Sequence, residues 1–286
     1  MLTAPFMQHA FLAGTLIAAA CGAVGYFVVL RSQVFSGDAL SHVAFTGALA
    51  ALAFGVDPRV GLFVATVAVG AGMGVLGQRG RPDDVVIGNV FTWVLGLGVL
   101  FMTIYAESSR SAGGTKSVSV LFGSIFGLSA NDAYVAAAVG LAVCLAVLVL
   151  ARPLLFASAD AAVADARGVP VRALGIAFLA LVGVCAAEAT QAVGALLLVG
   201  LLAAPAGAAR RLTVKPWRGL AFSSGLAVLV VWVGLVVSYL DGSLPPSFSI
   251  MAAAAVCYLA AVTADHARQR RRPVRADVRG RSVTLQ

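Results

Sequence analysis

The chain has 286 residues, of which 60% are hydrophobic and only 11% are charged, and its mean hydropathy is +0.97. In a soluble domain about a quarter of all residues are usually charged. This composition therefore excludes a soluble domain and predicts an all-α, polytopic membrane protein. The net charge of +8 would also suit a nucleic-acid-binding protein. In so apolar a chain we instead interpret it as Lys and Arg in cytoplasmic loops, with no nucleic-acid partner.

The apolar runs predict a transmembrane helical bundle with about nine spans, because a helix needs about 20 apolar residues to cross the hydrocarbon. The predicted spans are residues 10–30, 39–55, 60–77, 85–105, 133–150, 173–187, 192–209, 220–239 and 248–264. Residues 1–264 would form one transmembrane domain, followed by a basic, disordered tail, 265–286. The apolar piece 118–128 is too short to cross and predicts an interfacial or re-entrant helix.

The distribution of Lys and Arg predicts the orientation. If the N-terminus is outside, 17 of the 20 basic residues fall in inner segments, as the positive-inside rule requires. The odd number of spans then places the C-terminus in the cytoplasm, together with the loop 151–172. Within that loop, the Ala-rich piece 157–167 is followed by Gly168, which predicts a short helix with a glycine stop.

Neither a disulfide framework nor an ATPase site is expected. The four cysteines, Cys21, Cys144, Cys185 and Cys257, lie in apolar runs without a CxxC pair, which is typical of small buried hydrophobic residues. The segment 113–117 resembles a phosphate loop only superficially, because a threonine separates its glycine from its lysine. We therefore expect a protein without enzyme activity of its own. If ATP drives it, another subunit binds the ATP.

Asp38 and His42 form the pair with the clearest chemistry. Four residues apart at the start of an apolar run, they would share one helix face about one turn apart, and Thr46 would follow on the same face. Ionisable groups in a membrane helix are costly and suggest a pathway or ligand site. Carboxylate and imidazole together suit Mn²⁺, Zn²⁺ or Fe²⁺. The alternative is structural: Asp38 caps the helix and His42 bonds to a neighbouring helix.

Two further carboxylates are candidate metal ligands. Glu188 lies at the predicted outer end of the sixth span, where a solvated or hydrogen-bonded helix end is the structural alternative. Asp241 precedes a glycine and then a Pro-Pro pair, a pattern that is typical of a turn. The span 191–206 has recurrent small residues and a late proline, which predict close helix packing and a local break in the helix.

Three segments resemble the signatures of the ABC permeases that import zinc, manganese and iron. Residues 37–42, followed by Gly47, resemble the first signature, and residues 191–197 with 205–210 resemble the second. Residues 123–129 resemble a third, weaker one. The matches follow the family's order. One departure is Thr46, where the family commonly has proline.

The resemblance implies a permease of the cell membrane that works as a dimer with a second copy or a paralogue. It also implies cytoplasmic ABC ATPase subunits that bind the ATP, an extracytoplasmic metal-binding protein, and transported Zn, Mn or Fe rather than a stably bound cofactor. By this resemblance Asp38 and His42 would lie in the metal pathway. The resemblance supports such a role for Asp241 only weakly. The family's ATPase docks where residues 157–168 lie, which implies coupling roles for Asp160, Asp165, Arg167 and Gly168.

Two other functions fit the composition. A stand-alone, proton-driven secondary transporter would use Asp38, His42 or Glu188 as proton carriers, and inverted repeats with paired broken helices would support it. No such repeats are evident in the sequence. A non-transporting membrane scaffold would leave the shared face of Asp38 and His42 without a role.

Overall fold

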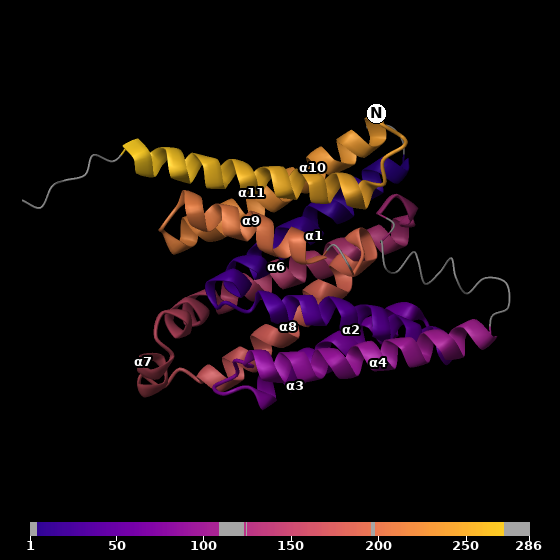
Figure 1. Cartoon of the computed structure of the whole chain (residues 1–286), viewed down its shortest axis with the longest axis horizontal. Helices are drawn as coiled ribbons and strands as arrows, with labels where there is room; N and C mark the ends of the chain where they lie inside the picture. Colours follow the sequence, from indigo (N-terminus) through magenta and orange to yellow (C-terminus); the bar gives the residue numbers. More distant parts are fainter. Residues whose placement is uncertain (1–4, 109–122, 124, 196–197, 272–286) are drawn as a thin grey trace, which may run out of the picture.

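The computed structural model describes residues 5–108, 123, 125–195 and 198–271, and these fold into a bundle of long helices (Figure 1). Their bounds are α1 Pro5–Leu30, α2 Val34–Ala53, α3 Pro58–Leu76, α4 Asp84–Ser108, η1 Ile125–Gly127, α6 Ala130–Ala159, α7 Ala161–Ala166, α8 Val171–Val193, α9 Leu198–Leu212, α10 Pro216–Leu240 and α11 Pro246–Arg271. In the described part of the chain the only β pairing is an isolated bridge between Gln78 and Arg81. The all-α prediction is therefore confirmed.

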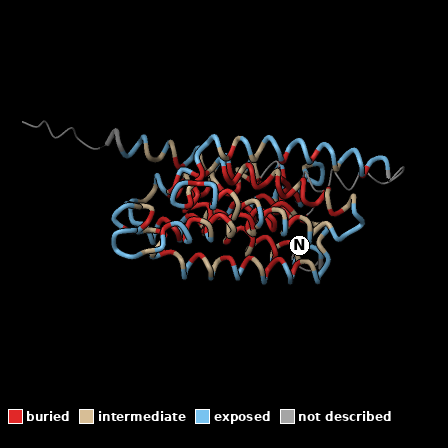
Figure 2. Tube along the Cα trace, turned by 90° about the horizontal axis from the view of Figure 1, so that it is seen from below, coloured by how far each residue is buried: buried red, intermediate tan, exposed pale blue. Residues whose placement is uncertain are grey.

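Helix α1 runs through the middle of the bundle. It packs against α6, α9 and α10, and more lightly against α8. On one side α2, α3, α4 and α8 form a group, and on the other α9, α10 and α11 form a second group (Figure 1). Buried residues lie along the middle of the molecule, and exposed residues follow its outer helices (Figure 2). The first helix is thus the element around which both groups assemble.

The interior combines many alanines with larger side chains such as Phe27 and Phe178, and large apolar side chains also lie on the outer surface. Side chains on the exposed faces include Trp93 of α4, Val149 of α6 and Leu259 of α11. Large apolar side chains on the outside are expected in a membrane, where lipid tails and not water surround the helices. These exposed apolar faces fit the multi-pass membrane protein that the composition predicted.

Seven described helices are long and apolar enough to cross a membrane by themselves. Helices α2 and α9 are the other two long elements that match predicted spans, but α9 has only 15 residues and α2 contains an acid, a histidine and several hydroxyl side chains. The predicted count of nine spans, and the orientation of the termini, therefore remain predictions.

Several predicted boundaries were wrong. Helix α6 continues to Ala159, through Pro153, so the first part of the predicted loop 151–172 is helical. Helix α11 continues to Arg271, so the predicted tail 265–286 begins as helix. Helix α8 runs to Val193, which makes the predicted polar connection 188–191 part of its last turns. The short piece 118–128 lies mostly outside the described residues, apart from Gly123 and 125–128.

The end of the bundle that carries α7, called the α7 end below, is held together by arginines that bind helix carbonyls. Arg172 donates to the Val75 carbonyl at 3.3 Å, and Arg210 donates to the Val29 carbonyl at 3.0 Å. The last carbonyls of a helix lack intrahelical partners, and cations near them are favourable. These bonds therefore fasten the ends of α3 and α1 to neighbouring helices.

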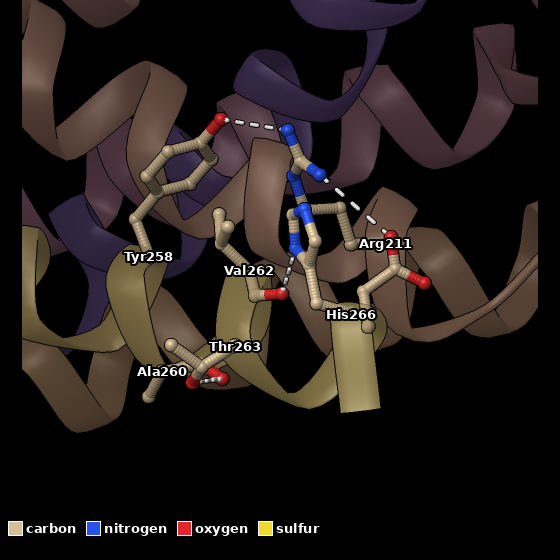
Figure 3. A network of polar contacts seen from close by, with 7 residues as sticks. Arg211, Tyr258, Ala260, Val262, Thr263 and His266 are labelled. Carbon is tan, nitrogen blue, oxygen red and sulfur yellow. Dashed lines mark hydrogen bonds and ion pairs between the residues drawn. The ribbon is translucent and has the colours of Figure 1, made fainter. Parts of the chain in front are cut away.

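A further arginine ties α9 to α11. Arg211 donates to the Tyr258 hydroxyl at 3.3 Å and lies 3.7 Å from the Asp265 carboxylate, with its guanidinium 5.5 Å from the Tyr258 ring centre (Figure 3). His266 directly follows Asp265, and its ring contacts the Val262 carbonyl at 2.9 Å (Figure 3). This network lies on the polar last turns of α11.

Close crossing of α2 and α3 depends on glycine. A Cβ built on Gly61 would lie 2.6 Å from the Ala51 Cβ, and one built on Gly47 would lie 2.5 Å from the Gly61 carbonyl oxygen. In a membrane, such small residues let helix backbones approach closely. The Gly- and Ala-rich composition of α3 thus permits its close packing against α2.

We predict opposite effects for two alanine substitutions within α3. Gly61→Ala will lower the stability by about 1–3 kcal/mol, because the new methyl group overlaps α2. Gly72→Ala meets no atom within 4 Å and will raise it by about 0.5–1 kcal/mol through the better helix propensity of alanine. Thermal unfolding of the purified variants measures both. A shift in the same direction for the two variants would contradict the packing described here.

Candidate functional site

Asp38 and His42 lie on the first half of α2. The helix begins at Val34, four residues before Asp38, and its N-cap residue is Gln33. The first structural alternative for Asp38, helix capping, is therefore wrong. The Ser41 hydroxyl donates to the backbone carbonyl of Asp38 at 2.7 Å, so this bond does not engage the Asp38 carboxylate. Its i, i+4 spacing places it on the same face as His42, as predicted.

Aromatic side chains border this face. The His42 and Phe91 rings meet edge to face, with centroids 5.1 Å apart at 79°, and Phe35 lies 6.1 Å from the same Phe91 ring. One turn along, the Thr46 hydroxyl donates to the Val94 carbonyl at 3.1 Å. Within the described residues the neighbour that His42 contacts on α4 is therefore an aromatic ring, and not the hydrogen-bonding group that the structural alternative requires.

The face of α2 that carries the pair is open at the surface of the chain. Phe35 is exposed, and Asp38, His42 and Phe45 are half-buried, whereas most of the other residues of the helix are buried. These four residues, called the α2 open face below, follow one another at spacings of three and four. The helices of this chain thus cover α2 on its other sides and leave this stripe partly uncovered.

The described residues of a single copy do not complete a metal site. In the described ranges no group of three or more His, Cys, Asp or Glu side chains is arranged to hold a metal ion. Asp38 and His42 supply two ligands, so a full shell needs water, backbone oxygens or another protein chain. Sites along a transport path must also release the ion, and a small ligand set suits that requirement.

Glu188 lies in the interior of the bundle rather than at a solvated helix end. It is 4% exposed, and its Oε2 has no hydrogen-bond partner among the described residues. The break between α8 and α9 falls at Gly194, whose φ of 94° suits glycine. The polar letters of residues 188–191 suggested an earlier break, but helix α8 buries Glu188 and Thr190 with its apolar residues.

Asp241 forms a turn at the end of α10. It is exposed, and its Oδ1 accepts hydrogen bonds from the Ser243 hydroxyl at 2.6 Å and the Ser243 N–H at 3.2 Å. The bond from the Ser243 hydroxyl, followed by the backbone bond, lowers the pKa of this carboxyl. The structural alternative, a polar turn before Pro245-Pro246, describes these contacts fully.

Helix α7 is the short helix predicted between the fifth and sixth spans. Asp160 caps it, accepting from the N–H groups of Ala162 at 2.9 Å and Val163 at 3.0 Å, and Gly168 follows it with a φ of 80°. The predicted helix with a glycine stop is confirmed. Asp165 and Arg167 are exposed, so their side chains are available to another protein.

A cavity of about 460 Å³ lies beside α7. Asp165, Val171 and Arg172 line it on one side, and the residues from Val75 to Arg79 line it on the other. Val163, which the sequence did not single out, is 46% exposed on α7. An exposed apolar side chain next to charged residues at the end of a bundle is typical of a contact surface for another protein.

Comparison with known proteins agrees with these features. The chain matches the model of the ABC 3 transport family over residues 3–265. It is 30% identical to the manganese transport system membrane protein MntC of Halalkalibacterium halodurans, covering 74% of this chain and 72% of that protein. It is also 30% identical to the manganese import system permease protein ScaB of Streptococcus parasanguinis, covering 82% of each chain.

A solved structure resembles the whole chain. PsaBC from Streptococcus pneumoniae, in complex with Fab, contains a chain that is 26% identical, with a TM-score of 0.78 and coverage of 91% of each chain. The family match extends over nearly all of the residues described above and includes α2 with Asp38 and His42, and α7 with its capping Asp160. This chain is a multi-pass protein of the cell membrane and belongs to the ABC 3 transport family, as a metal-type ABC transporter permease.

Proposed function

We propose that this chain is the membrane-spanning subunit of an ATP-driven importer of divalent transition metal ions, with Asp38 and His42 as ligands along the ion path. The observation that carries the proposal is the α2 open face, on which a carboxylate and an imidazole lie one turn apart and partly uncovered. Such groups are expensive in lipid and are expected to face a pathway or a partner.

The ligand chemistry narrows the cargo to a few ions. Carboxylate oxygen and imidazole nitrogen suit Mn²⁺, Fe²⁺ and Zn²⁺. The names of MntC and ScaB favour Mn²⁺, with Fe²⁺ and Zn²⁺ as the other members of the predicted set. The soft thiolates that would favour Zn²⁺ or Cu⁺ do not contribute, since Cys21, Cys185 and the other two cysteines lie on other helices.

A second copy of the chain, or a paralogue, supplies the rest of the ligand shell in this proposal. In a two-fold dimer the same surface of both subunits meets, so two α2 open faces would bring together two carboxylates and two imidazoles. That arrangement gives a mixed N/O shell from residues that a single copy leaves incomplete. It also removes Asp38 and His42 from contact with lipid.

Joining of two α2 open faces predicts a cross-link. Phe35→Cys, on the exposed edge of the face, will form a disulfide-linked dimer in membranes under mild oxidation. Phe222→Cys, at an exposed position of α10, serves as the matched control and will remain monomeric on a denaturing gel. Equal cross-linking of the two variants would contradict this dimer. It would also be contradicted if Phe35→Cys formed no dimer under oxidation or with thiol-reactive cross-linkers of several lengths.

The proposed energy input acts through α7. An ABC ATPase subunit would contact Asp165, Arg167 and Val163 on the cytoplasmic side, with Asp160 and Gly168 holding the shape of the short helix. An extracytoplasmic metal-binding protein would deliver the ion on the opposite side. Glu188 is a second candidate ligand, because its buried carboxylate has an oxygen without a hydrogen-bond partner among the described residues. Asp241 is the weakest candidate, since Ser243 already engages its carboxylate.

The test of the proposed function is the metal content of cells that lack this chain, measured metal by metal under metal starvation. We expect one of Mn, Fe or Zn to fall and to recover when the gene is restored. Unchanged levels of all three would support a scaffold instead. Copurification of an ATPase in mild detergent separates the proposed importer from a proton-driven transporter, which needs no such partner.

A further inference from the structure

A cluster of buried polar donors lies at the α7 end, around the N-terminal end of α2. Arg31 directly follows α1 and is only 6% exposed. Its Nε donates to the Gln33 Oε1 at 3.1 Å, and its guanidinium carbon lies 5.3 Å from the ring centre of Phe178. Both of its Nη atoms are buried, and neither has a hydrogen-bond partner among the described residues. Arg31 therefore holds a buried positive charge whose strongest donors are unused.

A second arginine intensifies this charge. The Arg81 Nη2 donates to the Ala157 carbonyl at 3.1 Å, and the Arg81 Nε is buried without a hydrogen-bond partner in the described part of the chain. Burial, followed by the nearby positive charge of Arg81, lowers the pKa of Arg31 to about 10. The two ion pairs within the described residues are Arg59–Asp132 and Arg211–Asp265. The protein's own described carboxylates thus leave both arginines of this cluster unpaired.

Neutral donors complete the cluster. The Gln33 Nε2 and the Ser36 Oγ are buried and lack partners in the described part of the chain, and they belong to the N-cap and first turn of α2. That helix has 20 residues, and its first N–H groups and the positive end of its dipole favour an anion. Ser32 and Arg79, in the two turns that carry the arginines, adopt left-handed φ values of 56° and 53°. Non-glycine residues rarely adopt such angles without a compensating role.

A buried charge without a counter-ion is strongly unfavourable, and a second charge of the same sign beside it adds to the cost. Bidentate guanidinium groups match the oxygens of phosphate and carboxylate. Two arginines, an amide and a helix N-terminus surround a tetrahedral, multiply charged oxyanion better than a planar, singly charged one. We propose that Arg31, Arg81 and Gln33 bind a phosphate group at the N-terminal end of α2.

Two sources can supply this phosphate group. The cluster lies where α1 and α3 end and α2 and α4 begin, which is the depth of lipid headgroups for a membrane-spanning helix. Basic pockets between transmembrane helices at this depth can bind anionic headgroups. Inorganic phosphate from solution is the other source. Ser32 is exposed and Arg81 is only partly buried, so the cluster lies directly beneath the surface.

The test is thermal unfolding of the purified full chain in an uncharged detergent. We expect inorganic phosphate, or phosphatidylglycerol, to raise the Tm of the wild type saturably by about 5 °C. Chloride at equal ionic strength and phosphatidylcholine serve as references. Arg31→Met will unfold at the same or a higher temperature than wild type without anion, because it removes an unpaired buried charge. Arg31→Met will also lose the rise in Tm that phosphate or phosphatidylglycerol causes in the wild type. A response to phosphate alone or to phosphatidylglycerol alone identifies the source.

Three further variants make the test specific. Arg79→Gln removes an exposed charge from the same turn as Arg81 and will respond as the wild type does. Arg81→Gln will lose most of the shift, and Arg31→Lys will keep part of it. The proposal is overturned if neither compound shifts the wild type beyond its reference, or if Arg31→Met and Arg81→Gln respond fully. Stabilisation only by a bound partner protein would assign the cluster to a protein carboxylate and would also overturn it.

Discussion

Replacement of Asp38 or His42 by alanine will reduce metal uptake by at least about 10-fold at an unchanged amount of protein in the membrane. Loss of groups that merely orient metal ligands typically costs 10–100-fold in affinity or activity, so loss of a ligand is expected to cost at least as much. Both side chains are half-buried on the α2 open face. The fold will therefore tolerate the substitutions. Radioactive Mn²⁺ uptake, with Fe²⁺ and Zn²⁺ as competitors, measures the effect.

Matched controls separate a ligand role from a general loss of charge. Asp84→Asn removes an exposed carboxylate from the first turn of α4, and His266→Ala removes an exposed histidine from the last turns of α11. Both variants will transport as the wild type does. The double variant Asp38→Ala/His42→Ala will be no worse than the more impaired single variant if both groups bind one ion. Normal uptake in both single variants would remove the pair from the mechanism.

A carboxylate introduced on or directly after α7 will uncouple the chain from the proposed ATPase. Val163→Glu places it on the exposed surface of this six-residue helix, and Arg167→Glu places it at the exposed C-cap. We expect each to reduce copurification of the ATPase and metal uptake by about 10-fold or more, because a buried unpaired charge in an interface typically costs 2–5 kcal/mol. The stability of the isolated chain will change by less than about 0.5 kcal/mol, as at other exposed positions.

Arg152→Glu is the control for this prediction. Arg152 is exposed on α6 near the same end of the bundle, so the variant makes the same change of charge outside α7. It will retain the ATPase and transport normally. If the α7 variants copurify with the ATPase as well as Arg152→Glu does, then α7 is not the coupling element.

Hydrophobic pattern predicted the helices well and their ends poorly. Eight of the nine predicted spans each correspond to one helix, because the apolar runs are long and separated by Gly, Pro and charged residues. The exception is the span 192–209, which includes the last two residues of α8 and most of α9. The helix ends were predicted wrongly where polar residues lie within a helix. Residues 188–191 suggested a connection, yet α8 continues to Val193 and buries Glu188. The predicted loop 151–172 overlaps the end of α6, which continues through Pro153 to Ala159.

The site was predictable where it depends on local spacing and not where it depends on distant contacts. The i, i+4 relation of Asp38 and His42 is visible in the sequence, and so is the short helix that ends before Gly168. The cluster of Arg31 and Arg81 is not visible, because it joins residues 50 positions apart with Phe178 and Ala157 of two further helices. In the sequence these arginines indicated orientation only. Their burial without carboxylates required the structure.

The most direct test of the account is Mn²⁺ transport by the purified chain and its ATPase in proteoliposomes, measured with and without ATP. We predict ATP-dependent movement of Mn²⁺ by the wild type, and none above background by Asp38→Ala/His42→Ala, although the ATPase still binds this variant and hydrolyses ATP. Transport of Mn²⁺, Fe²⁺ or Zn²⁺ by the double variant at the wild-type rate would contradict the account, as would the absence of ATP-dependent transport of all three ions by the wild type.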